Sequence, residues 1–250
     1  MSTPGVPIFC EFGDIAPEDF RRATEVTYLG TVWGTRAALK GMLPRNRGSI
    51  VQVGSALAYR SIPLQSAYCG AKHAIVGFTD SIRSELLHDG IDVALTCVHL
   101  PAVNTPQFTW CLNRMPNEAQ PVPPIFQPEL IADAIFHAAR HPRREIYLGW
   151  PAVEAILGQK LVPGYADRYL ARHGIDAQMT DQPRDPARPS NLFAPVPGDH
   201  GAHGRFDAQA RDRDRFATAT VRLGAAGVTA VAAAGLAVAI AGAMRLLRRR

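Results

Sequence analysis

Two short apolar runs separated by a long helical segment constrain the fold of this chain more than any other feature. Residues 48–54 read Gly-Ser-Ile-Val-Gln-Val-Gly, and residues 92–99 read Asp-Val-Ala-Leu-Thr-Cys-Val-His. Both runs are short, contain several β-branched residues and are bounded by glycine or polar residues, as buried strands are. Residues 65–88 between them are predicted to form a helix that stops at Gly90. Two strands joined by a helix predict a parallel βαβ unit.

Further helices and strands are predicted before and after this βαβ unit. A first helix is predicted over residues 17–43, because Pro17 suits the first helical turn and Pro44 ends the helix. Residues 128–141 are predicted to form a third helix, and residues 144–149 a third strand. Within the first helix, mostly small residues recur at three- and four-residue steps, which predicts a face packed closely on the sheet. These residues are Phe20, Ala23, Thr27, Gly30, Gly34, Ala37 and Gly41.

Composition divides the chain into three parts. Residues 106–127 are rich in proline and apolar residues, which predicts a long ordered loop or lid inside the first part. From residue 176 to residue 216, large apolar residues become rare and Pro, Asp, Arg, Gly and His dominate, which predicts a solvated tail with little packed structure. We therefore expect an α/β domain at residues 1–175, a polar tail at residues 176–216 and a transmembrane helix with a basic end at residues 217–250.

The transmembrane prediction rests on residues 223–244, which contain no charged side chain and lie between Arg222 and Arg245. As a helix, 22 residues extend about 33 Å, which is close to the hydrocarbon thickness of a bilayer. Ten of these residues are alanine and four are glycine, which weakens the apolar driving force. The alternative is therefore a disordered Ala/Gly-rich tail.

Charge and cysteine content narrow the classes of function. The formal net charge is +5, and Arg248, Arg249 and Arg250 follow the uncharged segment, which favours contact with anionic lipid over nucleic acid. The four cysteines form no Cys-x-x-Cys pair, so they indicate neither a zinc site nor a disulfide framework and fit a reducing compartment. His200 and His203 are interpreted as solvated residues of the tail, and no metal site is expected.

A candidate proton-transfer site follows from three residues. Tyr68 and Lys72 are four residues apart in the predicted helix over residues 65–88, so they lie on one face, one turn apart. An ammonium beside a phenol stabilises the phenolate, so Lys72 is expected to lower the pKa of Tyr68. Ser55 follows the first strand at its carboxyl end, where open parallel sheets bind ligands. Taken singly, these residues also fit a helix surface and a turn, but together they predict a site. Cys69 is interpreted as a buried filler.

Three segments resemble the second half of a short-chain dehydrogenase/reductase over residues 6–149: Gly54-Ser55, Ser66-Ala-Tyr68-Cys-Gly-Ala-Lys72 and Pro101-Ala-Val-Asn-Thr-Pro106. The resemblance implies a Rossmann-like, doubly wound parallel sheet. It implies NAD or NADP as the cofactor and a small carbonyl or alcohol compound as the substrate. Hydride would then pass between the nicotinamide and a carbonyl or alcohol carbon.

The resemblance also implies a role for each matched residue. Tyr68 would be the catalytic acid/base, and Ser55 would polarise the substrate oxygen. Lys72 would bind the nicotinamide ribose and tune Tyr68. Val103 and Thr105, which follow the second strand, would contact the nicotinamide amide. The expected catalytic set is Ser55, Tyr68 and Lys72, and the expected cofactor-binding set is Tyr68, Lys72, Val103 and Thr105.

Three departures from the family pattern stand beside this likeness. Thr27 occupies the position of an asparagine that often helps to relay protons in the family. Leu100-Pro101 replaces the usual Pro-Gly pair. The family's first strands and glycine-rich turn are expected to precede Met1, because residues 1–16 cannot supply them. The sheet is therefore expected to lack its first strands.

The favoured function is an NAD(P)-dependent oxidoreductase that is anchored in a membrane by residues 223–244. Its catalytic part is expected in the cytoplasm, where it meets the nicotinamide cofactor. The alternative is a catalytically inactive, membrane-tethered fragment or interaction module. The long helices also allow a homo-oligomer.

Overall fold

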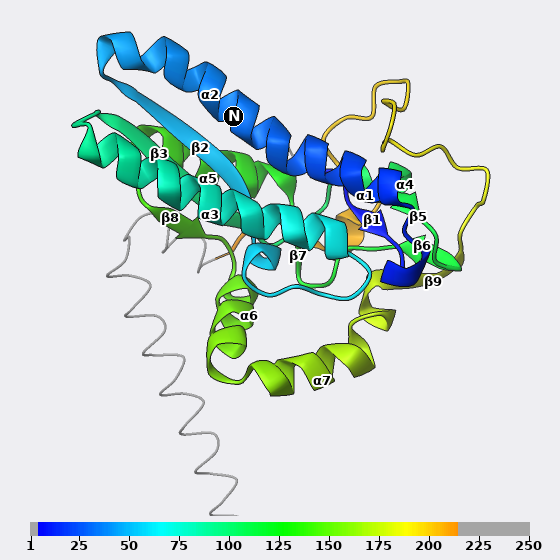
Figure 1. Ribbon diagram of the computed structural model, residues 1–250. Coiled ribbons are helices and arrows are strands. Elements are labelled where there is room, and N and C mark those ends of the chain that lie inside the picture. The colour runs from blue at the N-terminus through cyan, green and yellow to red at the C-terminus, as the bar shows by residue number, and fades with distance from the viewer. Residues whose placement is uncertain (1–4, 215–250) are drawn as a thin grey trace, which may run out of the picture.

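The computed structural model describes residues 5–214, and a parallel sheet lies at its centre (Figure 1). The sheet contains β2 (Gly48–Ser55), β3 (Val93–Leu100) and β8 (Glu145–Tyr147), hydrogen-bonded in the order β2-β3-β8. β2 and β3 pair in register along their full length, so their carboxyl ends lie side by side. The predicted parallel βαβ arrangement is confirmed.

Helices cover both faces of this sheet (Figure 1). α2 (Gly30–Met42) and α3 (Ser66–His88) lie on one face, and α5 (Pro128–Arg140) lies on the other. The alternation of side chains along β2 produces these two layers. Ile50 packs in a core with side chains of α2 and α3, whereas Val51 packs in a core with side chains of α5.

The predicted first helix is continuous, but it contains a π-helical turn. α1 (Pro17–Thr24) leads into the turn η2 (Glu25–Leu29), which leads directly into α2. The predicted face of small residues assumes a regular α-helical period along the whole helix. Beyond the π turn that prediction is wrong. Thr31 and Thr35 are buried there, whereas Gly34 is exposed. A π turn contains an additional residue, so the buried face continues one position later than predicted.

The predicted stop of α3 is confirmed at Gly90. This residue adopts φ +66°, a left-handed conformation that glycine adopts without steric strain. The chain then enters β3, so this glycine sets the sharp reversal that makes β3 parallel to β2.

The proline-rich loop after β3 is ordered through several short elements. One short helix and five two- or three-residue strands surround the carboxyl end of the main sheet, in small sheets of their own. They are β1 (Ile8–Phe9), β4 (Ala102–Val103), α4 (Gln107–Trp110), β5 (Leu112–Asn113), β6 (Asn117–Ala119) and β7 (Ile125–Phe126). β1 pairs with β5, and β4 pairs with β7, both in parallel.

The predicted solvated tail after residue 175 is largely exposed in the part that the structure describes, but it is anchored to the body at several points. β9 (Met179–Pro183) pairs with β6, and β10 (Ala210–Arg211) pairs with β7. Leu192 and Phe206 are buried, each in a different apolar cluster of the main body. A few isolated anchors therefore fix a segment whose average composition is polar. Single-turn helices complete the chain trace: η1 (Phe12–Asp14), η3 (Leu43–Arg45), η4 (Ala56–Ala58), η5 (Asp176–Gln178) and η6 (Asp207–Gln209).

Two further helices form a corner that projects from the body (Figure 1). α6 (Trp150–Leu161) follows β8, and α7 (Pro163–His173) follows α6 after a single residue. Sequence reasoning assigned no element to this stretch.

β2 is an edge strand within residues 5–214, because it pairs with β3 alone. The same residues contain no helix that is long and apolar enough to cross a membrane. Residues 223–244, which the sequence predicts as a membrane anchor, lie outside the described residues.

Candidate active site

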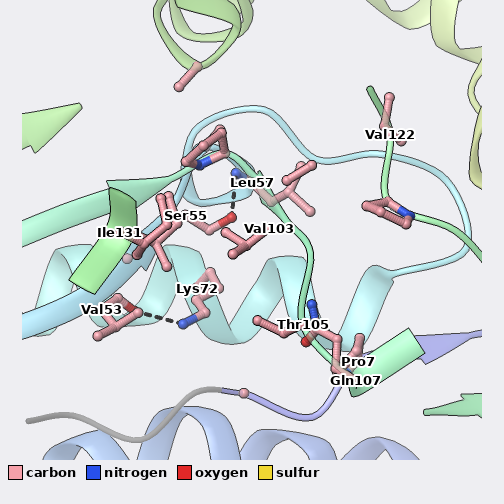
Figure 2. A pocket seen from close by; sticks show the side chains of 18 of the residues that line it. Pro7, Val53, Ser55, Leu57, Lys72, Val103, Thr105, Gln107, Val122 and Ile131 are labelled. Atoms are coloured by element: carbon pink, nitrogen blue, oxygen red, sulfur yellow. Dashed lines mark hydrogen bonds between the residues drawn. The ribbon is translucent and has the colours of Figure 1, made fainter. Parts of the chain in front are cut away.

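Ser55, Tyr68 and Lys72 come together at the carboxyl end of β2. Figure 2 shows Ser55 and Lys72 beside the same cavity. Ser55 is the last residue of β2, and its Oγ accepts a hydrogen bond of 3.1 Å from the backbone N–H of Leu57. Tyr68 lies in the first turn of α3 and is hydrogen-bonded to the side chain of Ser55. The backbone thus positions the serine, and the serine contacts the phenol.

Lys72 lies one turn further along α3 and is almost completely buried, at 1% exposure. Its Nζ donates a hydrogen bond of 2.7 Å to the backbone carbonyl of Val53 in β2. The same Nζ lies over the ring of Tyr68, 5.5 Å from the ring centroid. An ammonium has three donors, so the contact with Val53 leaves donors for another group in the site.

Burial dominates the electrostatics of this pair. It raises the pKa of Tyr68 above the ordinary value, and the hydrogen bond from Ser55 offsets this only in part. Burial also lowers the pKa of Lys72 to about 8. The expectation that Lys72 lowers the pKa of Tyr68 is therefore wrong for this structure, since the lysine approaches the ring face and burial prevails. Tyr68 is a neutral phenol at neutral pH, which is the form that donates a proton.

Val103 and Thr105 line the same cavity as Ser55 (Figure 2). Val103 lies in β4, directly after β3, and its side chain packs against α5. Its carbonyl accepts a hydrogen bond of 2.9 Å from the backbone N–H of Thr105. A turn thus brings both residues to the cavity that Ser55 enters from β2.

The cavity around these residues has a volume of about 700 Å³. It continues from Ser55 and Tyr68 along β2 and beneath α5. Within the described chain, Lys72 is the sole charged residue that lines it, and the other polar groups are glutamine, serine, threonine and tyrosine side chains. The walls are apolar, with contributions from Leu57, Leu100, Phe108, Val122, Ile131, Ile135, Pro151 and Ala155.

The residues present fit one end of a nicotinamide dinucleotide. A buried ammonium with free donors suits ribose hydroxyls, and Val103 and Thr105 lie across the same cavity from it. The pyrophosphate end differs, because residues 5–214 contain no glycine-rich turn between a strand and a helix, the usual cradle of a pyrophosphate. The site therefore fits the nicotinamide and its ribose.

Glycine is required at two close approaches around the site. A Cβ atom on Gly54 would lie 2.6 Å from His99 Nδ1 and 2.8 Å from Cys97 Sγ. A Cβ atom on Gly5 would lie 2.8 Å from the ring of Tyr68. These contacts are too short for any side chain, so both glycines let the backbone pass directly against the site.

Thr27 lies near the phenol. It is completely buried, its Oγ1 accepts a hydrogen bond of 3.2 Å from the backbone N–H of Val6, and it is the central residue of the π turn. A Cβ atom on Gly5 would touch both Thr27 and Tyr68. The hydroxyl of Thr27 is thus committed to the backbone that passes beside the phenol.

Sequence reasoning missed a buried histidine behind Ser55. His99 is completely buried at the end of β3, and its Nδ1 lies 3.3 Å from the carbonyl oxygen of Ser55. Its ring stacks on Tyr147 with centroids 5.0 Å apart and contacts Tyr59 edge-on. Burial lowers the pKa of His99 to about 4, so the ring is neutral at neutral pH. The end of β3 is buried on both faces. No alternation of polar and apolar residues therefore marks His99 in the sequence.

Sequence reasoning also missed a buried amide pair that holds the start of α3. Gln65 precedes the helix, and its Nε2 donates a hydrogen bond of 2.8 Å to Oε1 of Gln178. Gln178 in turn donates to the carbonyls of Pro63 and Gly174, at 3.0 and 2.6 Å. The segment after residue 175 thereby contacts the turn that delivers Tyr68, over a sequence separation that no local pattern reveals.

Comparisons with known proteins find similar dehydrogenases and oxidoreductases. Residues 2–111 match the family model described as short chain dehydrogenase. The uncharacterized oxidoreductase YxnA of Bacillus subtilis (strain 168) is 32% identical over 226 residues, which are 89% of this chain and 63% of that protein. Estradiol 17-beta-dehydrogenase 11 of Homo sapiens is 31% identical over 150 residues, which are 59% of this chain and 46% of that protein.

A solved structure is similar as well. A short chain dehydrogenase from Burkholderia cenocepacia J2315, solved in complex with NADP, has a TM-score of 0.56 and 25% identity, covering 67% of this chain and 68% of that one. The family model, the relatives and this structure are thus all similar to this chain as short-chain dehydrogenases or oxidoreductases. The chain spans less than two thirds of the length of the two curated relatives.

Proposed function

We propose that this chain carries the proton-transfer and nicotinamide-binding part of an NAD(P)-dependent short-chain dehydrogenase/reductase. The observation that carries the proposal is the convergence of Ser55, Tyr68 and Lys72 on one apolar cavity at the carboxyl end of β2. The likeness to an NADP-bound dehydrogenase supports NAD or NADP as the cofactor. The activity is hydride transfer between the nicotinamide and a carbonyl or alcohol carbon.

Each side chain has a separate task in this proposal. The hydroxyl of Ser55 hydrogen-bonds the substrate oxygen and holds it beside the phenol. Tyr68, kept neutral by burial, donates its proton to that oxygen during reduction and takes it back during oxidation. Lys72, held by the Val53 carbonyl, offers its remaining donors to the ribose hydroxyls. The bound nicotinamide supplies or accepts the hydride.

The cavity favours a neutral and largely apolar substrate. No described residue that lines it carries a second cation or a carboxylate, so a phosphate or carboxylate group of a substrate would have no partner except Lys72. Lys72 is assigned to the cofactor ribose. A relative whose name specifies estradiol, a bulky apolar alcohol, supports the same substrate class.

Within residues 5–214 the outer edge of β2 is open, which favours a second candidate, a catalytically inactive fragment or interaction module. An edge strand with unpaired N–H and C=O groups accepts a further strand from another segment or chain. This candidate predicts the same fold with no turnover, so an activity measurement separates it from the oxidoreductase.

Membrane anchoring is a proposal from composition alone. Residues 223–244 anchor the chain, and the catalytic part faces the cytoplasm, where the cofactor is available. Fractionation of the chain with and without the residues after 216 tests this. If both forms stay in the supernatant without detergent, the anchor is excluded.

Deuteride transfer tests the enzymatic function. The purified 250-residue chain is incubated with millimolar NADPH that carries deuterium at C4, together with a long-chain methyl ketone, and the alcohol is examined by mass spectrometry. We expect deuterium on the carbinol carbon with the unmodified chain and none above background with Tyr68→Phe. Equal background incorporation by both proteins would support the inactive candidate instead.

A further inference from the structure

The exposed corner of α6 and α7 concentrates large apolar side chains at the surface. Within residues 157–169, Leu161 is 75% exposed, Tyr165 is 69% exposed and Tyr169 is 53% exposed. Leu157 and Val162 are exposed as well. α7 contains no buried residue, and the corner projects away from the sheet (Figure 1). The helix therefore leaves most of its surface open to solvent within the described chain.

One face of α7 combines aromatic and cationic side chains. Tyr165, Arg168, Tyr169 and Arg172 are spaced at three- and four-residue steps, so they lie on one side of the helix, which we call the Tyr/Arg face. The rings of Tyr165 and Tyr169 stack with centroids 6.5 Å apart, and both arginines are exposed.

The acid of α7 points away from this face. Asp167 is the one carboxylate within residues 160–175, and its Oδ1 pairs with Nη2 of Arg60 at 2.8 Å. Arg60 lies in the loop after η4, in the body of the molecule. The ion pair therefore holds the carboxylate of Asp167, whose side chain is 68% exposed, on the side of α7 opposite the Tyr/Arg face.

We propose that the Tyr/Arg face of α7, with Leu161 beside it, docks on the anionic surface of a lipid bilayer. Charge complementarity selects this partner, because Lys160, Arg168 and Arg172 form no ion pair with a carboxylate within residues 5–214. Tyrosine rings suit the headgroup level, where one end of the side chain is apolar and the other wet. Arginine stems cover apolar surface while the guanidinium reaches phosphate.

One feature connects this docking face to the rest of the chain. Pro151, Ala152 and Ala155 of α6 line the apolar cavity, so the face that docks is one helix away from the site.

Hydrogen–deuterium exchange on the whole 250-residue chain reads this contact directly. Exchange is compared without vesicles, with phosphatidylcholine vesicles, and with vesicles that contain both phosphatidylcholine and phosphatidylglycerol. We expect peptides from residues 157–173 to exchange several-fold more slowly with the anionic vesicles, while peptides from α3 are unchanged. The readout is local, so binding through residues 223–244 alone does not imitate it.

Matched variants test whether the protection depends on the Tyr/Arg face or on any exposed aromatic and arginine side chains. Tyr169→Ser combined with Arg172→Gln is expected to abolish the added protection. Trp33→Ser combined with Arg36→Gln removes an exposed aromatic and an exposed arginine from α2, and is expected to leave the protection intact. Vesicle-bound chain with unprotected residues 157–173, or chain that binds no vesicle, would overturn the proposal. Protection that grows with protein concentration in the absence of lipid would overturn it too, in favour of a second copy.

Discussion

The unit from β2 to β3 and the segment from residue 174 to residue 214 pack against the same site by different means. The unit buries a repeating set of apolar side chains on both faces of two strands, and it presents Ser55, Tyr68 and Lys72 from regular elements. The later segment has only a few buried residues, among them Gln178 and Phe206, and depends on isolated hydrogen bonds.

Sequence pattern is informative for the unit and uninformative for the later segment. Apolar residues that are buried at regular spacing produce a periodic pattern in the sequence, whereas isolated buried residues produce none. The later segment nevertheless reaches the site, through the contact of Gln178 with Gln65 at the start of α3. We therefore expect strong chemical effects from changes in the unit and supporting effects from changes in the segment.

The largest effect is expected at the phenol. Tyr68→Phe removes the proton donor and keeps the ring, so deuteride transfer is expected to fall by about 10²–10⁴-fold. Binding of the apolar ketone, followed by calorimetry, should change little. If Tyr68→Phe retained deuteride transfer, Tyr68 would not be the proton donor. The unit from β2 to β3 would then not differ from the later segment in its chemical role.

The three residues at the end of β2 and the start of α3 are the part of the site that the sequence predicts best, for a physical reason. A four-residue spacing on a long helix and a serine at a strand end are local features, so the sequence alone places Tyr68, Lys72 and Ser55 together. The roles of these residues remain predictions. His99 and the pair of Gln65 and Gln178 could not be found, because their contacts join residues distant in sequence.

A second effect is expected from His99 in acid. Its pKa is near 6.5 when unfolded and about 4 when folded. Between these values the unfolded chain binds more protons, so stability present above pH 6.5 is lost as pH falls towards 4, by roughly 3 kcal/mol at most. Glu145, 3.9 Å away, opposes the shift, and its effect is already contained in the folded pKa of about 4.

Urea unfolding at several pH values from 7 to 5 measures how the free energy of unfolding depends on pH. His99→Phe preserves an aromatic ring between the two tyrosines and does not titrate, so its stability is expected to depend less on pH. An identical pH dependence in both proteins would mean that other groups cause the acid loss.

A third effect is expected in the later segment. Gln178→Leu leaves the carbonyls of Pro63 and Gly174 without their donor and costs about 1–3 kcal/mol. Thermal unfolding should report a lower Tm. Gln182→Leu, at an exposed position of β9, is the matched control and should leave Tm nearly unchanged. Equal Tm values for the two variants would show that the segment is a passive cover.

The smallest effect is expected where the same segment crosses α5. His203 bonds Asp207 and Glu129, both at 2.8 Å, and these bonds raise the pKa of His203 and lower those of the two acids. The stabilisation is complete below the unfolded histidine pKa of about 6.5 and is lost as pH rises through the folded value. All three groups are exposed, so the effect is modest.

Exchange of amides in residues 203–211, corrected for intrinsic rates, should therefore be slower at pH 6 than at pH 8. His203→Gln should remove this difference, and His200→Gln should preserve it. A difference that survives His203→Gln would place the pH sensitivity elsewhere in the segment.

The buried face of the first helix is predicted from a regular period, and one irregular turn makes that prediction wrong. A single π turn at Glu25–Leu29 moves the buried face by one residue, so Thr31 and Thr35 take the place of the expected glycines. No residue type in the turn announces it. Its centre, Thr27, bonds the backbone of Val6 beside Tyr68, which is a tertiary contact.

Calorimetry with the whole dinucleotide and with its nicotinamide half decides whether the site binds the nicotinamide end alone. Residues 5–214 provide donors for the nicotinamide ribose and no glycine-rich cradle for the pyrophosphate. Reduced nicotinamide mononucleotide and NADPH are therefore expected to bind the 250-residue chain with similar affinity, weaker than micromolar, and Lys72→Met should weaken both. Micromolar or tighter binding of NADPH with much weaker binding of the mononucleotide, or no saturable binding of either, would contradict this assignment.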